Sequence, residues 1–174
     1  AYGGNATFGG YNANIKETGD VGWLAGVAFQ LPEIALKTSL TYRSEIEHSV
    51  NARETFNSAG SFGALNFLTP NKTDITTPQS ANLDFQTGIM ADTVAFANVR
   101  WVNWKDFSIR PDKFGKASLI AGQSPTVNKP NGFDLVAYTD DQWSANVGVG
   151  RKLTEQWAGN ISVGWDSGAG NPVT

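Results

Sequence analysis

The sequence predicts an all-β fold, an antiparallel transmembrane β-barrel segment of about six strands. Three observations predict it: apolar and polar residues alternate with a period of two, short connections alternate with long ones, and glycine and aromatic residues are abundant. The 174 residues include 19 glycines, ten phenylalanines and six tryptophans, and only 17% of the chain is charged. Hydrophobic residues make up 40% of it, which argues against disorder.

The composition excludes several classes of function. Cysteine is absent, so thiol chemistry, thiolate metal sites and disulfide bonds are excluded. The net charge is −3, which disfavours a nucleic-acid interface. His48 is the single histidine, and no Gly-x-Ser-x-Gly motif accompanies it. Acidic pairs at 45/47 and 140/141 could act as acid and base, but solvated charge is their commoner role. We therefore expect no enzyme, no cofactor and no dedicated metal site.

Six segments have the pattern of β-strands. In the last of them, Ile161 and Val163 alternate with Asn160 and Ser162, so one face is apolar and the other polar. Such a strand turns one side to lipid or a protein core and the other to water or a lumen. The six segments are residues 22–31, 34–50, 81–90, 93–107, 141–153 and 157–166.

The connections between these segments alternate in length. Tight turns are predicted at 31–33, 91–92 and 153–156. Long polar segments rich in glycine, proline and asparagine separate the hairpins, and we expect outer loops at about 1–21, 51–79, 108–138 and 167–174. This order is typical of an outer-membrane barrel with tight periplasmic turns. Residues 1–174 are therefore interpreted as one partial barrel.

The spacing of two tryptophans is consistent with a membrane-spanning strand. Trp157 and Trp165 share one face and lie about 26 Å apart along a strand, which projects to about 20 Å on the membrane normal. The apolar band of an outer-membrane barrel is about 25 Å tall. Core tryptophans of a soluble β-sandwich fit this single strand equally well, so a soluble carbohydrate-binding module remains the alternative.

Two arginines on the polar face are candidate ligand-binding residues. Arg43 and Arg100 project to the side that also carries Asp84, Glu45 and Glu47. One interpretation is a ladder of ion pairs that stiffens the lumen wall. The other is an anion site, because a guanidinium can bind a carboxylate with two hydrogen bonds.

The loop at 51–79 contains a second set of candidates. Its GSFGALNFLTP segment (60–70) is unusually apolar for an exposed loop. These side chains either plug the mouth of the barrel or form a surface that captures hydrophobic ligands. The four candidates are Phe62, Leu65, Phe67 and Leu68.

Four segments resemble the FadL family of outer-membrane long-chain fatty-acid transporters. They are QLPEIALKTSLTYRSEIEHSV (30–50), TPQSANLDFQTGIMAD (77–92), VRWVNWKDF (99–107) and NISVGWDSGAGNPV (160–173). The resemblance implies a fourteen-stranded barrel with an N-terminal hatch, of which this chain supplies the sixth to eleventh strands. It also implies that segments 1–21 and 51–79 form the external capture groove, which favours a binding role for the apolar loop residues.

This chain departs from the family in two respects. The hatch, its Asn-Pro-Ala motif and the kinked strand that opens sideways are not in the sequence. The family can offer a lysine to the ligand carboxylate where this sequence has Thr139, Asp140 and Asp141, so that site is not carried over. Six strands cannot close such a barrel, and lipid does not tolerate an open sheet edge. We therefore expect a segment of a longer protein.

The expected function is passive outer-membrane transport of long-chain fatty acids or related hydrophobic compounds, in a Gram-negative bacterium. Ligand would be captured at the outer loops and would diffuse through the barrel without catalysis. The expected partners are the hydrophobic ligand, outer-membrane lipid, and the remaining strands and hatch of the parent barrel. A barrel with a purely structural or adhesive role would share the architecture and lack the ligand.

Overall fold

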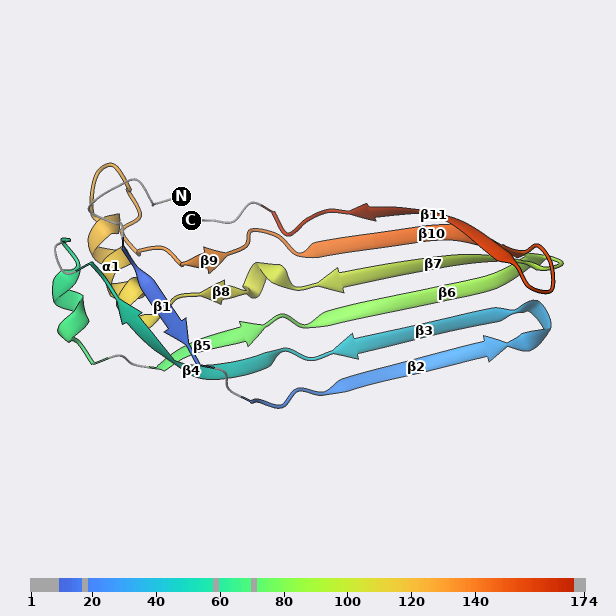
Figure 1. Ribbon diagram of the computed structural model, residues 1–174, viewed down its shortest axis with the longest axis horizontal. Helices are drawn as coiled ribbons and strands as arrows, with labels where there is room; N and C mark the ends of the chain where they lie inside the picture. The colour runs from blue at the N-terminus through green and yellow to red at the C-terminus, as the bar shows by residue number, and fades with distance from the viewer. Residues whose placement is uncertain (1–9, 17–18, 58–59, 70–71, 171–174) are drawn as a thin grey trace.

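The computed structural model describes residues 10–16, 19–57, 60–69 and 72–170. Its sheets are antiparallel and dominate the chain, which confirms the predicted all-β class. Figure 1 shows a long sheet with a smaller group of short strands and helical segments at one of its ends.

Six strands form the long sheet in the order β11-β10-β7-β6-β3-β2. Every neighbouring pair is antiparallel. Each of the six predicted segments contributes one of these strands, so their existence and type are confirmed. The strands are β2 (Leu24–Leu31), β3 (Leu36–Arg43), β6 (Ser80–Met90), β7 (Thr93–Val102), β10 (Gln142–Lys152) and β11 (Ala158–Asp166).

Tight turns join these strands into three hairpins at the end of the sheet far from the α-helix (Figure 1). The short 3-10 helix η1 (Pro32–Ile34) links β2 to β3, and Ala35 follows it in the left-handed region with a φ of 52°. Asp92 has a φ of 55° in the turn between β6 and β7. Aspartate tolerates this conformation better than most residues. Each turn overlaps its predicted position, although the first occupies 32–35 and not 31–33.

The predicted strand 34–50 is wrong in its length, because it is two strands in different sheets. β3 ends at Arg43, and β4 (Ile46–Thr55) begins a second sheet. Buried Ser44 lies at the break, where its Oγ accepts the Trp23 N–H at 2.9 Å and its own N–H donates to the Trp23 carbonyl at 2.9 Å. Alternation continues through Ser44, so periodicity alone gives no sign of the change of sheet.

The second sheet has the order β1-β4-β5, with β1 spanning Asn12–Ile15 and β5 spanning Lys72–Thr77. The segment 51–79, predicted as a loop, therefore contains the end of β4 and all of β5. The predicted strand 93–107 is shorter than expected, because β7 ends at Val102 and the 3-10 helix η3 (Trp104–Asp106) follows. Two-residue strands β8 (Ser108–Ile109) and β9 (Val136–Ala137) pair beyond it.

Two more of the four predicted loops contain regular structure, because β1 lies in 1–21 and a helix lies in 108–138. α1 spans Asp112–Gly122 and follows Pro111. Its first residue forms an i,i+4 ion pair with Lys116, Oδ2 to Nζ at 2.7 Å. In the part of the chain that the structure describes, no helix has the length and apolar character needed to cross a membrane.

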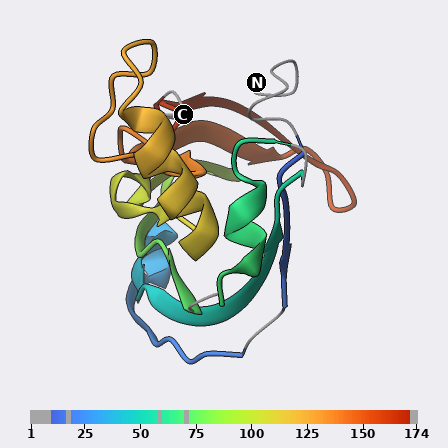
Figure 2. The same cartoon turned by 90° about the vertical axis from the view of Figure 1, so that its left-hand side faces the viewer.

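The hydrophobic core lies at the helical end of the molecule. Phe62, Ala117 and Ala121 are buried against one another, and Phe56, Leu65 and Phe133 pack around them. The core therefore joins α1 to the 3-10 helix η2 (Gly63–Phe67) and the end of β4. Figure 2 shows these elements grouped at the end of the long sheet.

Candidate functional site

One face of the long sheet is apolar from edge to edge. Strand pairing aligns a complete row of apolar residues across all six strands. This row consists of Val27, Leu40, Leu83, Val99, Ala145 and Trp165. The next row, two residues along each strand, contains Phe29, Phe85, Val147 and Val163, with Thr38 as its polar member.

No described segment covers this face. Val147 is 60% exposed, Val163 is 71% exposed and Ile161 is 81% exposed. Contiguous apolar surface of this kind marks contact with a partner or a membrane, because water disfavours it. The long sheet is therefore a layer whose apolar side is built to contact something outside the described chain.

Aromatic residues gather on the apolar face near the helical end of the sheet. The Trp23 and Tyr42 rings lie 5.1 Å apart, and those of Trp101 and Trp143 lie 6.5 Å apart. The Trp101 indole N–H donates to an Asp141 carboxylate oxygen at 2.9 Å. Trp157 lies toward the hairpin end of the same face and is exposed. Aromatic side chains with a polar end are suited to the boundary between an apolar and a wet region.

The opposite face is polar. A row containing Ser39, Asp84, Asn98 and Asn146 crosses four neighbouring strands. Asp84 is the centre of a hydrogen-bond network, with the Asn98 amide donating to Oδ1 at 2.7 Å and the Asn82 amide donating to Oδ2 at 2.6 Å. A cavity of about 620 Å³ adjoins this network. This face is suited to water or a polar solute.

Arg43 and Arg100 line one cavity on the polar face, with a volume of about 380 Å³. Strand register explains their proximity, because Arg43 pairs with Ser80 and Arg100 pairs with Asn82 on the intervening strand β6. Neither guanidinium forms an ion pair with a carboxylate among the described residues. The described chain thus shows no ion-pair ladder at these two residues, and an anion could bind to both.

A chain of hydrogen-bonded residues also lines this cavity. The Trp104 indole N–H donates to the Gln142 side-chain oxygen at 2.9 Å, and the Gln142 amide donates to Asp166 at 2.9 Å. Asp166 also accepts the Gly168 N–H at 2.6 Å. Its carboxylate lines the same cavity as the two arginines and forms no ion pair with either of them among the described residues.

The four apolar loop candidates separate into two pairs. Phe62 is 7% exposed and belongs to the core, and Leu65 packs against it. Phe67 is 92% exposed, and Leu68 beside it is also exposed. The first pair fixes η2 on α1, whereas the second pair presents apolar surface to the outside.

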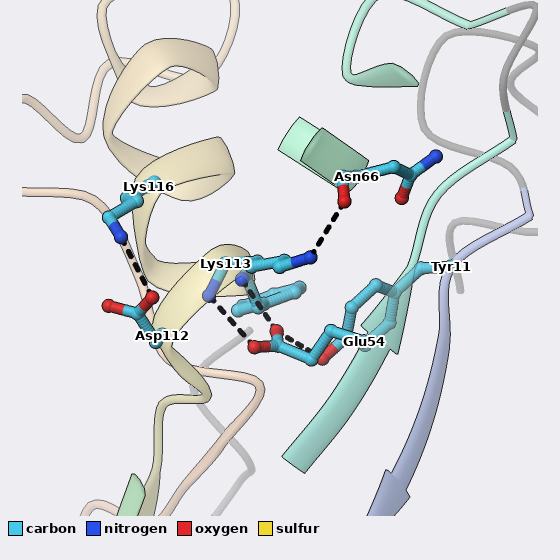
Figure 3. Close-up of polar contacts among 7 residues, drawn as sticks. Tyr11, Glu54, Asn66, Asp112, Lys113 and Lys116 are labelled. Atoms are coloured by element: carbon cyan, nitrogen blue, oxygen red, sulfur yellow. Dashed lines mark hydrogen bonds and ion pairs between the residues drawn. The ribbon is translucent and has the colours of Figure 1, made fainter. Parts of the chain in front are cut away.

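A buried carboxylate connects β4 to α1 (Figure 3). Glu54 is 2% exposed, and it accepts the backbone N–H groups of Lys113 and Phe114, each at 2.8 Å. The Tyr11 hydroxyl donates to the same carboxylate at 2.9 Å. Burial first, and then the charge and hydrogen bond of Glu54, raise the pKa of Tyr11 well above its ordinary value.

Sequence reasoning missed this cluster. Val50, Ala52 and Glu54 share one face of β4 and are all buried. In the sequence Glu54 stands two residues after Ala52 and four after Val50, so this alternation could have predicted that the carboxylate lies on a buried face. A helical spacing of Phe114, Ala117 and Ala121 was also present in the supposed loop.

No protein-family model matches the sequence, and no curated protein matches it either.

Proposed function

We propose that this chain is part of an outer-membrane β-barrel that transports long-chain fatty acids or related hydrophobic compounds passively. The observation that carries the proposal is the exposed apolar row on one face of six antiparallel strands, backed by a polar face. In the proposed arrangement the apolar face contacts acyl chains and the polar face lines the lumen. The resemblance to the FadL family supplies the class of ligand.

Capture would begin at the exposed loop pair. Phe67 and Leu68 offer apolar surface to an alkyl chain, and each buried methylene contributes about 0.8 kcal/mol. Arg43 and Arg100 would orient the ligand carboxylate inside the mouth, because their guanidinium groups share a cavity. The route needs binding and diffusion and no covalent step.

A soluble carbohydrate-binding sandwich is the competing interpretation. It predicts that a second sheet covers the apolar face. The exposure of Val147 and Val163 does not support such a cover among the described residues. The short sheet β1-β4-β5 contributes instead to the helical end of the molecule.

A matched pair of charge substitutions tests the membrane assignment. Ile161→Arg places a cation on the apolar face, and Ser162→Arg places one on the polar face of the same strand. Arginine near the bilayer midplane costs about 2–4 kcal/mol, so only Ile161→Arg should prevent membrane assembly of the full-length protein. The readout is the heat-dependent gel mobility of the membrane fraction. Equal assembly of the two variants would rule out the proposed orientation.

A further inference from the structure

The cavity that Arg43 and Arg100 line contains more than these two cations. Two arginines and one aspartate give its lining a formal charge of +1, which favours an anion with a single negative charge. Four further residues of the lining have hydroxyl, amide or carboxylate side chains, and they are Ser80, Gln142, Ser144 and Asp166. Such groups are suited to a ligand that has a hydrogen-bonding group besides its carboxylate.

Strand register places three of these residues in one row on the polar face. Arg100 of β7 pairs with Ser144 of β10, and Ser144 pairs with Asp166 of β11. The three strands are neighbours in the long sheet (Figure 1). Adjacent strands lie about 4.8 Å apart, so the Cα atoms of Arg100 and Asp166 are about 10 Å apart. A ligand head over Ser144 therefore has an arginine on one side and an aspartate on the other.

The Asp166 carboxylate is held in place by donors of the protein. The Gln142 amide donates to its two oxygens at 3.1 and 2.9 Å, and the Gly168 N–H donates to Oδ1 at 2.6 Å. The Gln142 oxygen accepts the Trp104 indole N–H at 2.9 Å, which fixes the amide with its N–H groups toward Asp166. A carboxylate has about four acceptor sites, so Asp166 can accept a further hydrogen bond from a ligand.

This acceptor distinguishes between classes of anionic head. An unsubstituted carboxylate bound to Arg100 faces the like charge of Asp166 and has no proton to donate to it. A head that also carries a hydroxyl can donate that hydroxyl to Asp166 while its carboxylate contacts the guanidinium. An amino acid head could pair with Asp166 as well, but it has no net charge, and the +1 charge of the lining favours a monoanion.

We propose that this cavity selects hydroxy acids, which carry a hydroxyl close to the carboxylate. Arg100 binds the carboxylate, Asp166 accepts the hydroxyl, and Gln142 is the positioning residue that holds Asp166. This inference rests on the proposed function, because it narrows the ligand of the transport route to hydroxylated fatty acids.

Equilibrium dialysis of the full-length protein in detergent, against the same detergent without protein, tests the proposal. The probes are decanoate and 3-hydroxydecanoate, which differ by one hydroxyl. 3-Hydroxydecanoate should bind about 10-fold more tightly, the gain expected from one hydrogen bond to a charged group. Asp166→Asn replaces the charged acceptor with an amide, so the preference should fall to about 2-fold or less while decanoate binding is retained. This ratio of two affinities does not respond to a general loss of folded protein.

Asp84→Asn is the matched control, because it removes the same charge from the polar face at a different cavity. It should keep the preference of the unmodified protein. Gln142→Met is a second test, since it leaves the Asp166 carboxylate and removes the amide that holds it. The preference should fall in this variant as well.

Equal binding of the two acids by the unmodified protein would overturn this inference and leave the proposed function standing, whereas binding of neither acid would overturn both. A preference that survives in Asp166→Asn would also overturn the inference. If Asp166→Asn binds neither acid, a preference that survives in Gln142→Met has the same consequence.

Discussion

The carboxylate of Glu54 accepts the backbone N–H of Phe114 at 2.8 Å, which joins β4 to the first turn of α1. The first N–H groups of a helix have no partner within the helix, and a carboxylate also complements the positive end of the helix dipole. Pro111 precedes the helix and offers no side-chain cap of its own. Glu54, which lies on a distant strand, thus caps the N-terminus of α1 in place of a local capping residue.

Replacing this carboxylate should loosen α1 without unfolding the long sheet. Glu54→Gln removes the charge and directs an amide toward the N–H groups of Lys113 and Phe114, which we expect to cost about 1–3 kcal/mol. Hydrogen exchange of the α1 amides should accelerate, whereas exchange in β6 and β7 should not change. Asp112→Asn, at the partly buried ion pair with Lys116, is the control and should have a smaller effect. Uniform acceleration across the sheet would contradict this local role.

The stability of the same region should fall at alkaline pH. Burial and the Glu54 charge raise the pKa of Tyr11 above its ordinary value of 10.0, so the folded phenol keeps its proton when the unfolded one ionises. The stabilisation is therefore complete below pH 10 and is lost as the pH rises above it. Urea unfolding followed by hydrogen exchange of the α1 amides should show this loss, and Tyr11→Phe should abolish its pH dependence. A slope that persists in Tyr11→Phe would assign the titration to another group.

Under the proposed function, Arg43 and Arg100 should recognise the charge of a ligand and not its alkyl chain. Arg43→Gln and Arg100→Gln should each weaken oleate binding by about 1.5–3 kcal/mol, and the double substitution should show coupling because both line one cavity. Methyl oleate should bind the variants and the unmodified protein alike. Lys37→Gln, which lines the separate cavity beside Asp84, is the control. Equal loss for oleate and its methyl ester would exclude a carboxylate site.

The strands of the long sheet could be predicted from the sequence because the pattern that specifies each strand is local. Alternation in segments such as 157–166 and turn residues such as Asp92 specify strands and hairpins one at a time. The break at Ser44 was hidden, because the bend depends on contacts with Trp23, which is 21 residues away. α1 was hidden for a related reason: its cap comes from Glu54, and no local capping residue marks its start.

In the candidate site, too, local patterns were predictable and contacts between distant residues were not. The alternation of apolar and polar residues predicted that Arg43 and Arg100 lie on the polar face. That they line one cavity depends on the register between the strands, which the sequence does not show. Composition marked the loop residues Phe62 and Phe67 as unusual, and it could not show which of them is buried, since that depends on packing against α1.

These two phenylalanines should respond differently to truncation. Phe62→Ala removes a core ring that packs near Phe56 and Ala117, and it should destabilise the helical end by about 3 kcal/mol. Phe67→Ala should leave stability unchanged and should weaken binding of a fluorescent fatty acid, because its ring is exposed. Thermal unfolding and ligand titration on the same preparations separate the two effects. Unchanged fatty-acid affinity in Phe67→Ala would remove this residue from the proposed capture surface.

Two neighbouring glycines on the polar face of β10 should differ in their tolerance of a methyl group. A Cβ at Gly148 would lie 2.5 Å from the Phe96 ring and 2.6 Å from the Ile161 carbonyl, whereas at Gly150 its nearest neighbour would be 3.6 Å away. The Ile161 carbonyl belongs to the backbone of β11 and cannot move without disturbing the strand pairing. Gly148→Ala should therefore cost about 1–3 kcal/mol, and Gly150→Ala should stay within about 0.5 kcal/mol of the unmodified protein. Denaturant unfolding of both variants measures the difference. Equal stabilities would mean that β10 and β11 are not packed as closely as this register requires. The apolar row would then not continue from Ala145 to Trp165.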